Sequence, residues 1–184
     1  MNRIEKKFKE LKRAKKRAFI AFITAGYPNL NTTKKLLLEF SKIGVDIVEL
    51  GVPFSDPLAD GPTIQASSQR ALKNHVNLDK IFHLAARIRR RSSLPLTLMT
   101  YYNPIFHYGE NAFVRKAKKS GIDGIIVPDL PPEEASHLIR LAKKANLSTV
   151  FFISPTTTPQ RMKRIVKAST GFIYYVSLTG VTGA

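Results

Sequence analysis

The chain contains no cysteine, and this absence excludes several kinds of functional site. Without cysteine there is no disulfide framework, no thiolate nucleophile and no cysteine-ligated metal. The four histidines are scattered and lack the close spacing of a metal site. We therefore expect no metal site, and the composition fits a reducing cytoplasm.

Long apolar segments are also missing. No apolar run approaches the roughly 20 residues that a membrane helix needs. The basic residues near the N-terminus are not followed by the apolar region of a signal peptide. We expect no membrane contact and a cytoplasmic location, with the plastid stroma as the alternative compartment.

Acidic residues are scarce. The chain has 13 Asp and Glu residues against 30 Lys and Arg residues, a formal net charge of +17. Such an excess suggests an anionic partner, but most basic residues recur once per helical segment, as on solvated outer faces. No aromatic RNA-binding strand or helix-turn-helix spacing accompanies them. We expect no nucleic-acid partner, and a basic anion- or nucleic-acid-binding module is kept as an alternative function.

Short apolar runs alternate with helical patterns along the chain. Nearly continuous apolar strands of this kind indicate a parallel sheet that is buried on both faces. The predicted strands are residues 18–24, 46–50, 94–101, 124–127, 149–153 and 172–176.

Apolar residues spaced three and four positions apart predict the helices between these strands. We expect Asn31 or Thr32 to cap the second helix, Asn77 to cap the fourth and Gly121 to end the fifth. The predicted helices are residues 1–14, 31–42, 63–74, 78–90, 110–119, 132–145 and 159–168.

Two architectures fit this alternation, a doubly wound open sheet and a (β/α)₈ barrel of the TIM type. A doubly wound nucleotide binder needs a glycine-rich first turn, but residues 25–29 read AGYPN, without GxGxxG or a Walker lysine. We therefore predict a barrel with about six of its eight strand–helix units present, since a whole barrel needs about 250 residues. We expect residues 1–184 to form a single domain with an extra N-terminal helix. The sequence ends within the loop after strand six.

The stretch from residue 46 to residue 65 carries two acids at positions suited to acid/base chemistry. Glu49 ends a buried strand, and Asp60 lies on the loop that follows. Barrel active sites are built at the carboxyl ends of the strands. Two simpler readings stay open: Glu49 as a strand-end ion pair, and Asp60-Gly61 as an ordinary turn.

Several motifs along the chain carry a family resemblance. The segment ELGVPFSDPLADGPTIQ resembles the signature of the tryptophan synthase alpha chain family. The resemblance runs from residue 1 to residue 184, and its further motifs are FIAFITAGYPN, TYYNPIF, GIDGIIVPDLPPEE and YYVSLTGVTGA. It implies cleavage of indole-3-glycerol phosphate to indole and glyceraldehyde 3-phosphate.

The same resemblance implies roles for the two acids. The reaction is a retro-aldol cleavage, in which indole C3 gains a proton and a side-chain hydroxyl of the substrate loses one. Glu49 matches the family's acid/base residue, because a carboxyl whose pKa is raised by burial can do both in turn. Asp60 matches the residue that accepts charge or a proton from the indole N–H.

The resemblance also implies substrate contacts and a partner. Phe22, Tyr101 and Tyr174 are expected to line the indole pocket, and Thr182 and Gly183 match the catalytic end of a lid, where Gly183 offers an amide to phosphate. No cofactor is expected in this chain. The expected partner is a beta chain that uses pyridoxal phosphate, in an alpha2-beta2 heterotetramer. Its contacts are expected at residues 53–60 and 103–106.

One part of the family pattern is missing. Barrel phosphate sites usually come from the loops after strands seven and eight, which this sequence does not include. An incomplete barrel leaves strand edges unpaired and apolar surface exposed. We therefore expect 184 residues alone, as a fragment, to fold poorly and to cleave no substrate. A non-catalytic partner that only activates a beta chain is the second alternative.

Overall fold

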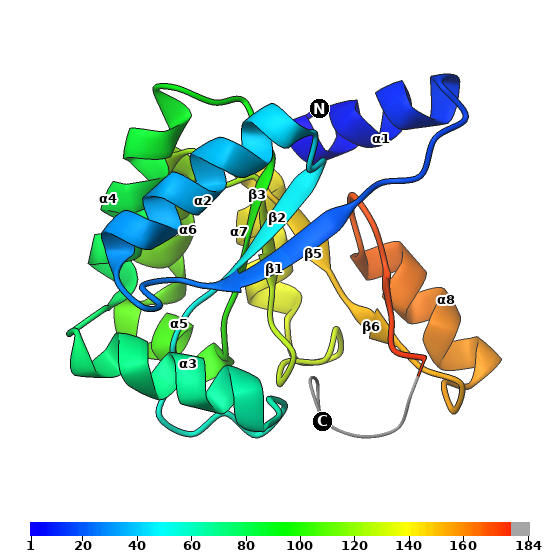
Figure 1. The fold of residues 1–184 in the computed structure, drawn as a ribbon. Coiled ribbons are helices and arrows are strands. Elements are labelled where there is room, and N and C mark those ends of the chain that lie inside the picture. Colours follow the sequence, from blue (N-terminus) through cyan, green and yellow to red (C-terminus); the bar gives the residue numbers. More distant parts are fainter. Residues whose placement is uncertain (178–184) are drawn as a thin grey trace.

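A parallel sheet forms the centre of the protein in the computed structural model, which describes residues 1–177 (Figure 1). Five strands follow one another in chain order, each hydrogen-bonded to the next in parallel. A second, two-stranded parallel sheet follows. The strands are β1 (Ile20–Thr24), β2 (Ile47–Gly51), β3 (Leu96–Met99), β4 (Gly124–Ile126), β5 (Ser148–Val150), β6 (Phe152–Ile153) and β7 (Tyr174–Tyr175).

The predicted strand 149–153 is wrong in one respect, because the structure divides it at Phe151. β5 pairs with β4 on one side, whereas β6 pairs with β7 on the other. The carbonyl of Phe151 accepts a hydrogen bond from the amide of Tyr174 at 2.9 Å. The wall of the predicted barrel thus continues from β5 into β7, with a change of pairing partner at this point.

Helices connect the strands and cover the outer face of the sheet (Figure 1). Asn77 and Gly121 cap their helices as predicted, but the second helix is capped by Asn29, whose side chain accepts from the amide of Thr32. The helices are α1 (Arg3–Arg13), α2 (Leu30–Ile43), α3 (Pro62–Lys73), α4 (Leu78–Arg89), α5 (Tyr102–Tyr108), α6 (Glu110–Ser120), α7 (Ser136–Lys144) and α8 (Pro159–Ala168).

Two helical features differ from the sequence prediction. α5 was not expected, and α7 begins at Ser136 instead of residue 132. The amides of Glu134 and Ala135 both donate to the carbonyl of Pro131, which makes a turn before the helix. Two successive prolines favour such a turn, because neither has an amide to donate.

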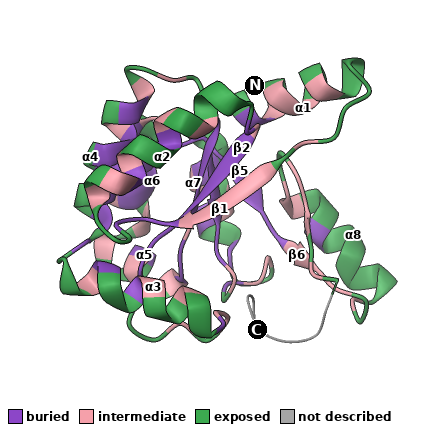
Figure 2. Ribbon diagram, in the orientation of Figure 1, coloured by how far each residue is buried: buried purple, intermediate pink, exposed green. Residues whose placement is uncertain are grey.

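Burial follows the barrel pattern. β2 is buried throughout, whereas β1 is only partly covered, and the exposed residues lie on the outer helices (Figure 2). Val48 and Leu50 belong to the core between sheet and helices, so Ile47 and Glu49 point to the opposite, inner face. Within residues 1–177, β1 pairs only with β2. This edge is therefore open, as expected for a barrel with six of eight units.

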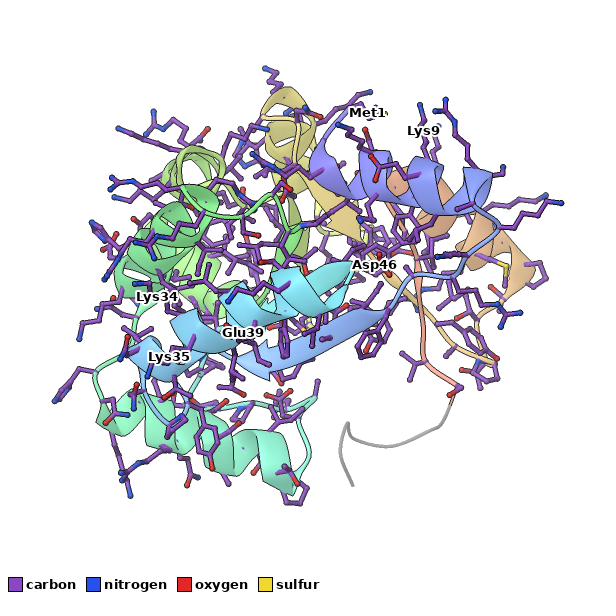
Figure 3. All side chains as sticks on the ribbon, turned by 45° about the horizontal axis from the view of Figure 1, so that its top comes forward. Met1, Lys9, Lys34, Lys35, Glu39 and Asp46 are labelled. Carbon is purple, nitrogen blue, oxygen red and sulfur yellow. The ribbon has the colours of Figure 1, made fainter. Side chains whose placement is uncertain are left out.

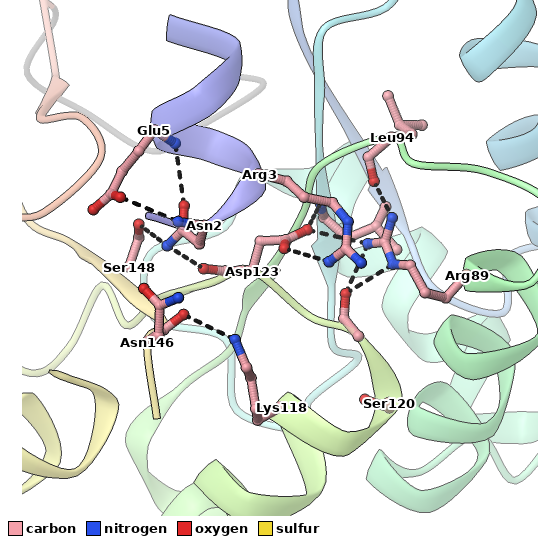
Figure 4. A network of polar contacts seen from close by, with 12 residues as sticks. Asn2, Arg3, Glu5, Arg89, Leu94, Lys118, Ser120, Asp123, Asn146 and Ser148 are labelled. Carbon is pink, nitrogen blue, oxygen red and sulfur yellow. Dashed lines mark hydrogen bonds and ion pairs between the residues drawn. The ribbon is translucent and has the colours of Figure 1, made fainter. Parts of the chain in front are cut away.

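α1 packs against the end of the sheet where the strands begin, at the top of Figure 1. Ile4 is fully buried, and a Cβ built on Gly124 would lie 2.9 Å from its Cδ1 atom, so the end of the Ile4 side chain packs directly against the glycine. The Asn2 side chain donates to Ser148 Oγ at 2.8 Å and to the carbonyl of Asp123 at 3.2 Å (Figure 4). The extra N-terminal helix thus closes the end of the barrel opposite to the strands' carboxyl ends.

Most basic side chains lie on the outside. Figure 3 shows Lys9 on α1 and Lys34 and Lys35 on α2 directed away from the sheet. This agrees with the prediction of solvated outer faces. Among the described residues, no helix is long and apolar enough to span a membrane, and no group of acidic and histidine side chains is arranged to hold a metal ion.

Candidate active site

Glu49 lies in the middle of the inner face of the sheet. In the strand register it stands beside Phe22 of β1 and Thr97 of β3. The residue is only 4% exposed. This burial raises the pKa of the carboxyl from 4.5 to about 7, because the charged form loses its hydration.

The Glu49 carboxyl has no neutralising partner among residues 1–177. Burial is the sole cause of its raised pKa, without an opposing cation or hydrogen-bond donor. Among the described residues, every fully buried polar side-chain atom has a hydrogen-bond partner. Because the Glu49 oxygens have none, they are not fully buried and keep some contact with solvent. Residues 1–177 thus supply no cation for the reading of Glu49 as a strand-end ion pair. The side chain can exchange a proton near neutral pH.

Tyr174 lies within electrostatic reach of Glu49. Burial and, second, the negative charge of Glu49 raise the pKa of the Tyr174 hydroxyl. Tyr174 is on β7 and Glu49 on β2, so the two side chains come from separate parts of the barrel wall. The structure thus brings together a predicted acid/base residue and a predicted pocket residue.

Asp60 and Tyr101 form a second polar group above the sheet. The amide of Ala59 donates to the Tyr101 hydroxyl at 2.8 Å. Burial raises the pKa of Asp60, while a hydrogen bond from Tyr101 lowers it. Burial, with a contribution from the nearby Asp60 charge, raises the pKa of Tyr101 to about 12. The hydroxyl therefore stays protonated and fixes the loop that carries Asp60.

The backbone at Asp60 also forms a turn, which is the simpler interpretation of Asp60-Gly61 given above. The amide of Asp60 donates to the carbonyl of Pro57 at 3.3 Å, and Gln65 Nε2 donates to the carbonyl of Asp60 at 2.8 Å. On the Asp60 side both bonds use only main-chain atoms. The carboxyl remains directed to the cavity beside Tyr101.

A small cavity lies at the carboxyl ends of β1 to β3. Its lining contains three of the predicted residues: Phe22, Asp60 and Tyr101. Glu49 and Tyr174 do not line this cavity. Glu49 lies two residues before Gly51, which does line it, and beside Phe22 in the register. Thr182 and Gly183 lie outside the described residues.

Sequence reasoning missed Gly51 as a residue of this site. A Cβ at Gly51 would lie 2.6 Å from Cζ of Phe22, a distance that real Cβ atoms do not show. The absent side chain therefore leaves space for the Phe22 ring beside Glu49. The glycine that ends the apolar run before VPF was the available signal, since glycine in a strand often marks such a close approach.

We expect Tyr101→Phe to weaken substrate use without unfolding the protein. The change removes the hydroxyl that accepts from Ala59 and donates to Asp60, while the ring keeps its contact with Phe54, centroid to centroid at 5.3 Å. Loss of two hydrogen bonds, one to a charged group, predicts a fall in kcat/KM of about 10- to 100-fold. Steady-state kinetics test this; unchanged kcat/KM would show that the hydroxyl does not position Asp60.

The position of these acids is that of a barrel active site, and comparison with known proteins identifies the family. The family model described as tryptophan synthase alpha chain matches residues 8–184. The chain belongs to the tryptophan synthase alpha chain family. Its members are lyases of tryptophan biosynthesis, and the TIM-barrel prediction is confirmed.

Curated and solved relatives of the tryptophan synthase alpha chain family support this assignment. The alpha chain of Geotalea daltonii is 48% identical over 184 residues, which are 100% of this chain and 70% of the relative. The crystal structure of the Legionella pneumophila alpha subunit has a TM-score of 0.94 at 41% identity, covering 96% of this chain and 68% of that one. A tryptophan synthase complex from Pyrococcus furiosus matches at a TM-score of 0.82 and 44% identity, over 86% of this chain and 65% of that one.

These relatives of the tryptophan synthase alpha chain family are longer than the sequence described. The chain spans about 70% of the length of the Geotalea relative. This agrees with the prediction that part of the family's barrel is missing from the 184 residues.

Proposed function

We propose that this chain cleaves indole-3-glycerol phosphate, with Glu49 as the acid/base residue. The observation that carries the proposal is the buried Glu49 carboxyl, with a pKa of about 7 and no cationic partner in the described residues. A carboxyl of ordinary pKa would be ionised at neutral pH and could not donate a proton.

Glu49 would act twice. In its neutral form it donates a proton to C3 of the indole ring, which makes the ring a leaving group. The resulting carboxylate then takes the proton of the substrate's glycerol hydroxyl, on the carbon next to the breaking bond. The electron pair of the C–C bond passes to the ring as the hydroxyl carbon becomes an aldehyde, so indole and glyceraldehyde 3-phosphate form and Glu49 regains its proton.

Asp60 would stabilise the charge on the ring nitrogen. Protonation at C3 places positive charge on this nitrogen, and an adjacent carboxylate stabilises that charge or accepts the N–H proton. The Tyr101 hydroxyl holds Asp60 at the cavity. Phe22, which lines the same cavity beside Glu49, would contact the flat face of the indole.

The pKa of Glu49 predicts a pH dependence of the reaction. The neutral carboxyl starts the cycle, and its fraction falls as the pH rises through about 7. We expect kcat/KM to fall about tenfold per pH unit above that value. A pH profile of indole release measures this, and a flat profile from pH 6 to 9 would be inconsistent with Glu49 as the proton donor.

A beta-chain partner follows from the comparisons at the level of the family, since solved relatives are tryptophan synthase complexes. We propose that this chain contacts the partner through residues 53–60 and 103–106. Each segment presents an exposed apolar side chain: Leu58 is 87% and Phe106 69% exposed. Exposed apolar side chains, one on the loop before α3 and one on the short helix α5, suit a protein interface.

Charged substitutions at these positions test the interface. We expect Leu58→Asp together with Phe106→Asp to weaken binding to the beta chain at least about 100-fold, because charges replace apolar contacts. The matched control is Ile43→Asp, at a residue 72% exposed at the end of α2 and outside both segments. Titration calorimetry with the purified beta chain would show the loss; equal binding by all variants would exclude this surface.

No step of this scheme calls for a cofactor in the chain, and pyridoxal phosphate is expected in the partner beta chain. The alternative of a non-catalytic activator predicts a different result. If the full-length chain raised beta-chain activity but released no indole from indole-3-glycerol phosphate, the proposed reaction would be wrong. The buried, unpaired Glu49 favours catalysis, because an activator has no use for a costly buried carboxyl.

A further inference from the structure

A groove between helices α2 and α4 lies on the outer layer of the protein, away from the strands' carboxyl ends. The two helices pack side by side (Figure 1). A hollow of about 500 Å³ between them is lined by Leu30, Asn31 and Lys34 of α2 and by Lys80, His83, Leu84 and Arg87 of α4. We call this hollow and its continuation the α2–α4 groove.

The continuation adds two more cations. A second hollow of about 250 Å³ is lined by Lys34, Arg87, Arg90 and Arg91, so two residues belong to both hollows. Residues 80, 83 and 87 of α4 and its C-cap residue Arg90 follow the spacing of a single helix face. From Lys80 to Arg90 the row extends about 15 Å along the helix, at 1.5 Å per residue.

No acid lines either hollow in the described structure. The acidic residues on these two helices are engaged elsewhere: Glu39 with Lys42 at 2.8 Å, and Asp79 with the Tyr108 hydroxyl at 2.8 Å. None of the five Lys and Arg residues of the groove forms an ion pair within residues 1–177, as the described pairs all involve other cations. Their charges therefore repel one another and attract anions.

We propose that the α2–α4 groove binds a linear polyphosphate anion. A single phosphate is too short to contact the whole row, whereas linked phosphates can follow it. Lysine and arginine are the usual phosphate ligands, and guanidinium groups bind phosphate oxygens in pairs. The lining holds no Phe, Tyr or Trp ring on which a base could stack, and its one ring is the imidazole of His83, so we expect the phosphates and not a nucleobase to be recognised.

Titration calorimetry of the full-length protein with inorganic tripolyphosphate tests this proposal. We expect binding that weakens with added salt. The double variant Lys34→Glu, Arg87→Glu removes the two residues shared by both hollows, and we expect its affinity to fall at least about tenfold. Neither residue belongs to the proposed catalytic site, so indole release would serve as a check that the variant is folded.

The matched control is Lys143→Glu, Lys144→Glu, which lowers the net charge equally at exposed positions of α7. We expect its affinity to stay within about twofold of the wild type, since long-range charge effects are screened by salt. If both variants lost affinity for tripolyphosphate equally, net charge alone would account for the binding, and the proposal of a site in the α2–α4 groove would be wrong. If the protein bound ATP or single-stranded DNA far more tightly than tripolyphosphate, a nucleobase would contribute to binding. The proposal that the groove recognises the phosphates alone would then be wrong.

Discussion

Replacing Glu49 with Gln is expected to abolish indole release while making the protein more stable at alkaline pH. Glutamine has nearly the same shape but can neither donate nor accept the catalytic proton. General acid–base catalysis contributes about 10²- to 10⁴-fold, and one residue that performs two transfers lies at the upper end. We therefore expect kcat to fall by about 10⁴-fold, as measured by indole release from the full-length protein.

The gain in stability follows from the pKa of Glu49. Its pKa is raised from 4.5 to about 7 in the folded state, so the wild type loses stability as the pH rises between these values. The loss amounts to about 3 kcal/mol and is complete above pH 7. Glutamine has no such dependence. Denaturant unfolding would measure the free energy of unfolding of the variant minus that of the wild type. We expect this difference to be about 3 kcal/mol larger at pH 8 than at pH 4.

A surface carboxyl provides the control for this variant. Glu39 is exposed on α2 and pairs with Lys42 at 2.8 Å. We expect Glu39→Gln to change stability by less than about 1 kcal/mol and to leave indole release intact. If Glu49→Gln behaved in the same way as this control, the assignment of Glu49 would be wrong.

The second large effect is expected at Asp123, far from the cavity. Its side chain is 2% exposed and accepts from Arg3 Nη1 at 2.9 Å, from Arg89 Nη2 at 3.1 Å and from the amide of Leu96 at 3.1 Å (Figure 4). These bonds join α1, α4 and β3 at the closed end of the barrel. Asp123→Ala would leave the charge of Arg89, whose side chain is 13% exposed, without its acid. We expect a loss of about 3–5 kcal/mol in the free energy of unfolding.

A double variant separates this ion pair from simple loss of volume. Asp123→Leu together with Arg89→Met replaces both charges by apolar groups, which is often tolerated. We expect the double variant to be more stable than Asp123→Ala in urea unfolding. A double variant as unstable as the sum of its single changes would show that the two residues do not interact.

Much of the fold could be predicted from local patterns. Apolar runs located the parallel strands β1 to β5, and the caps Asn77 and Gly121 act through neighbouring residues. The division of residues 149–153 was beyond reach, because β6 changes partner to a strand that lies more than 20 residues later in the chain. The start of α5 depends in the same way on Asp129, which accepts the amide hydrogen of Tyr102 from another loop.

The site could be predicted only in part. The motif pointed to Glu49 and Asp60, but neither the missing partner of Glu49 nor its pKa is a local property. The link between Tyr174 and Glu49 likewise depends on the fold, which brings β7 close to β2. Gly51 was overlooked because its role is to leave space for Phe22, a residue of the adjacent strand. The contributions of Thr182 and Gly183 stay predictions.

The most direct test of the central claim is the titration of Glu49 itself. The full-length protein, labelled with ¹³C at the glutamate side-chain carboxyl, would be followed by NMR from pH 4 to pH 9, and Glu49→Gln would assign the signal. The account predicts a midpoint near pH 7, because the buried carboxyl loses its hydration without gaining a partner. A midpoint near the ordinary value of 4.5 would contradict it, since Glu49 would then be ionised at neutral pH and have no proton to donate.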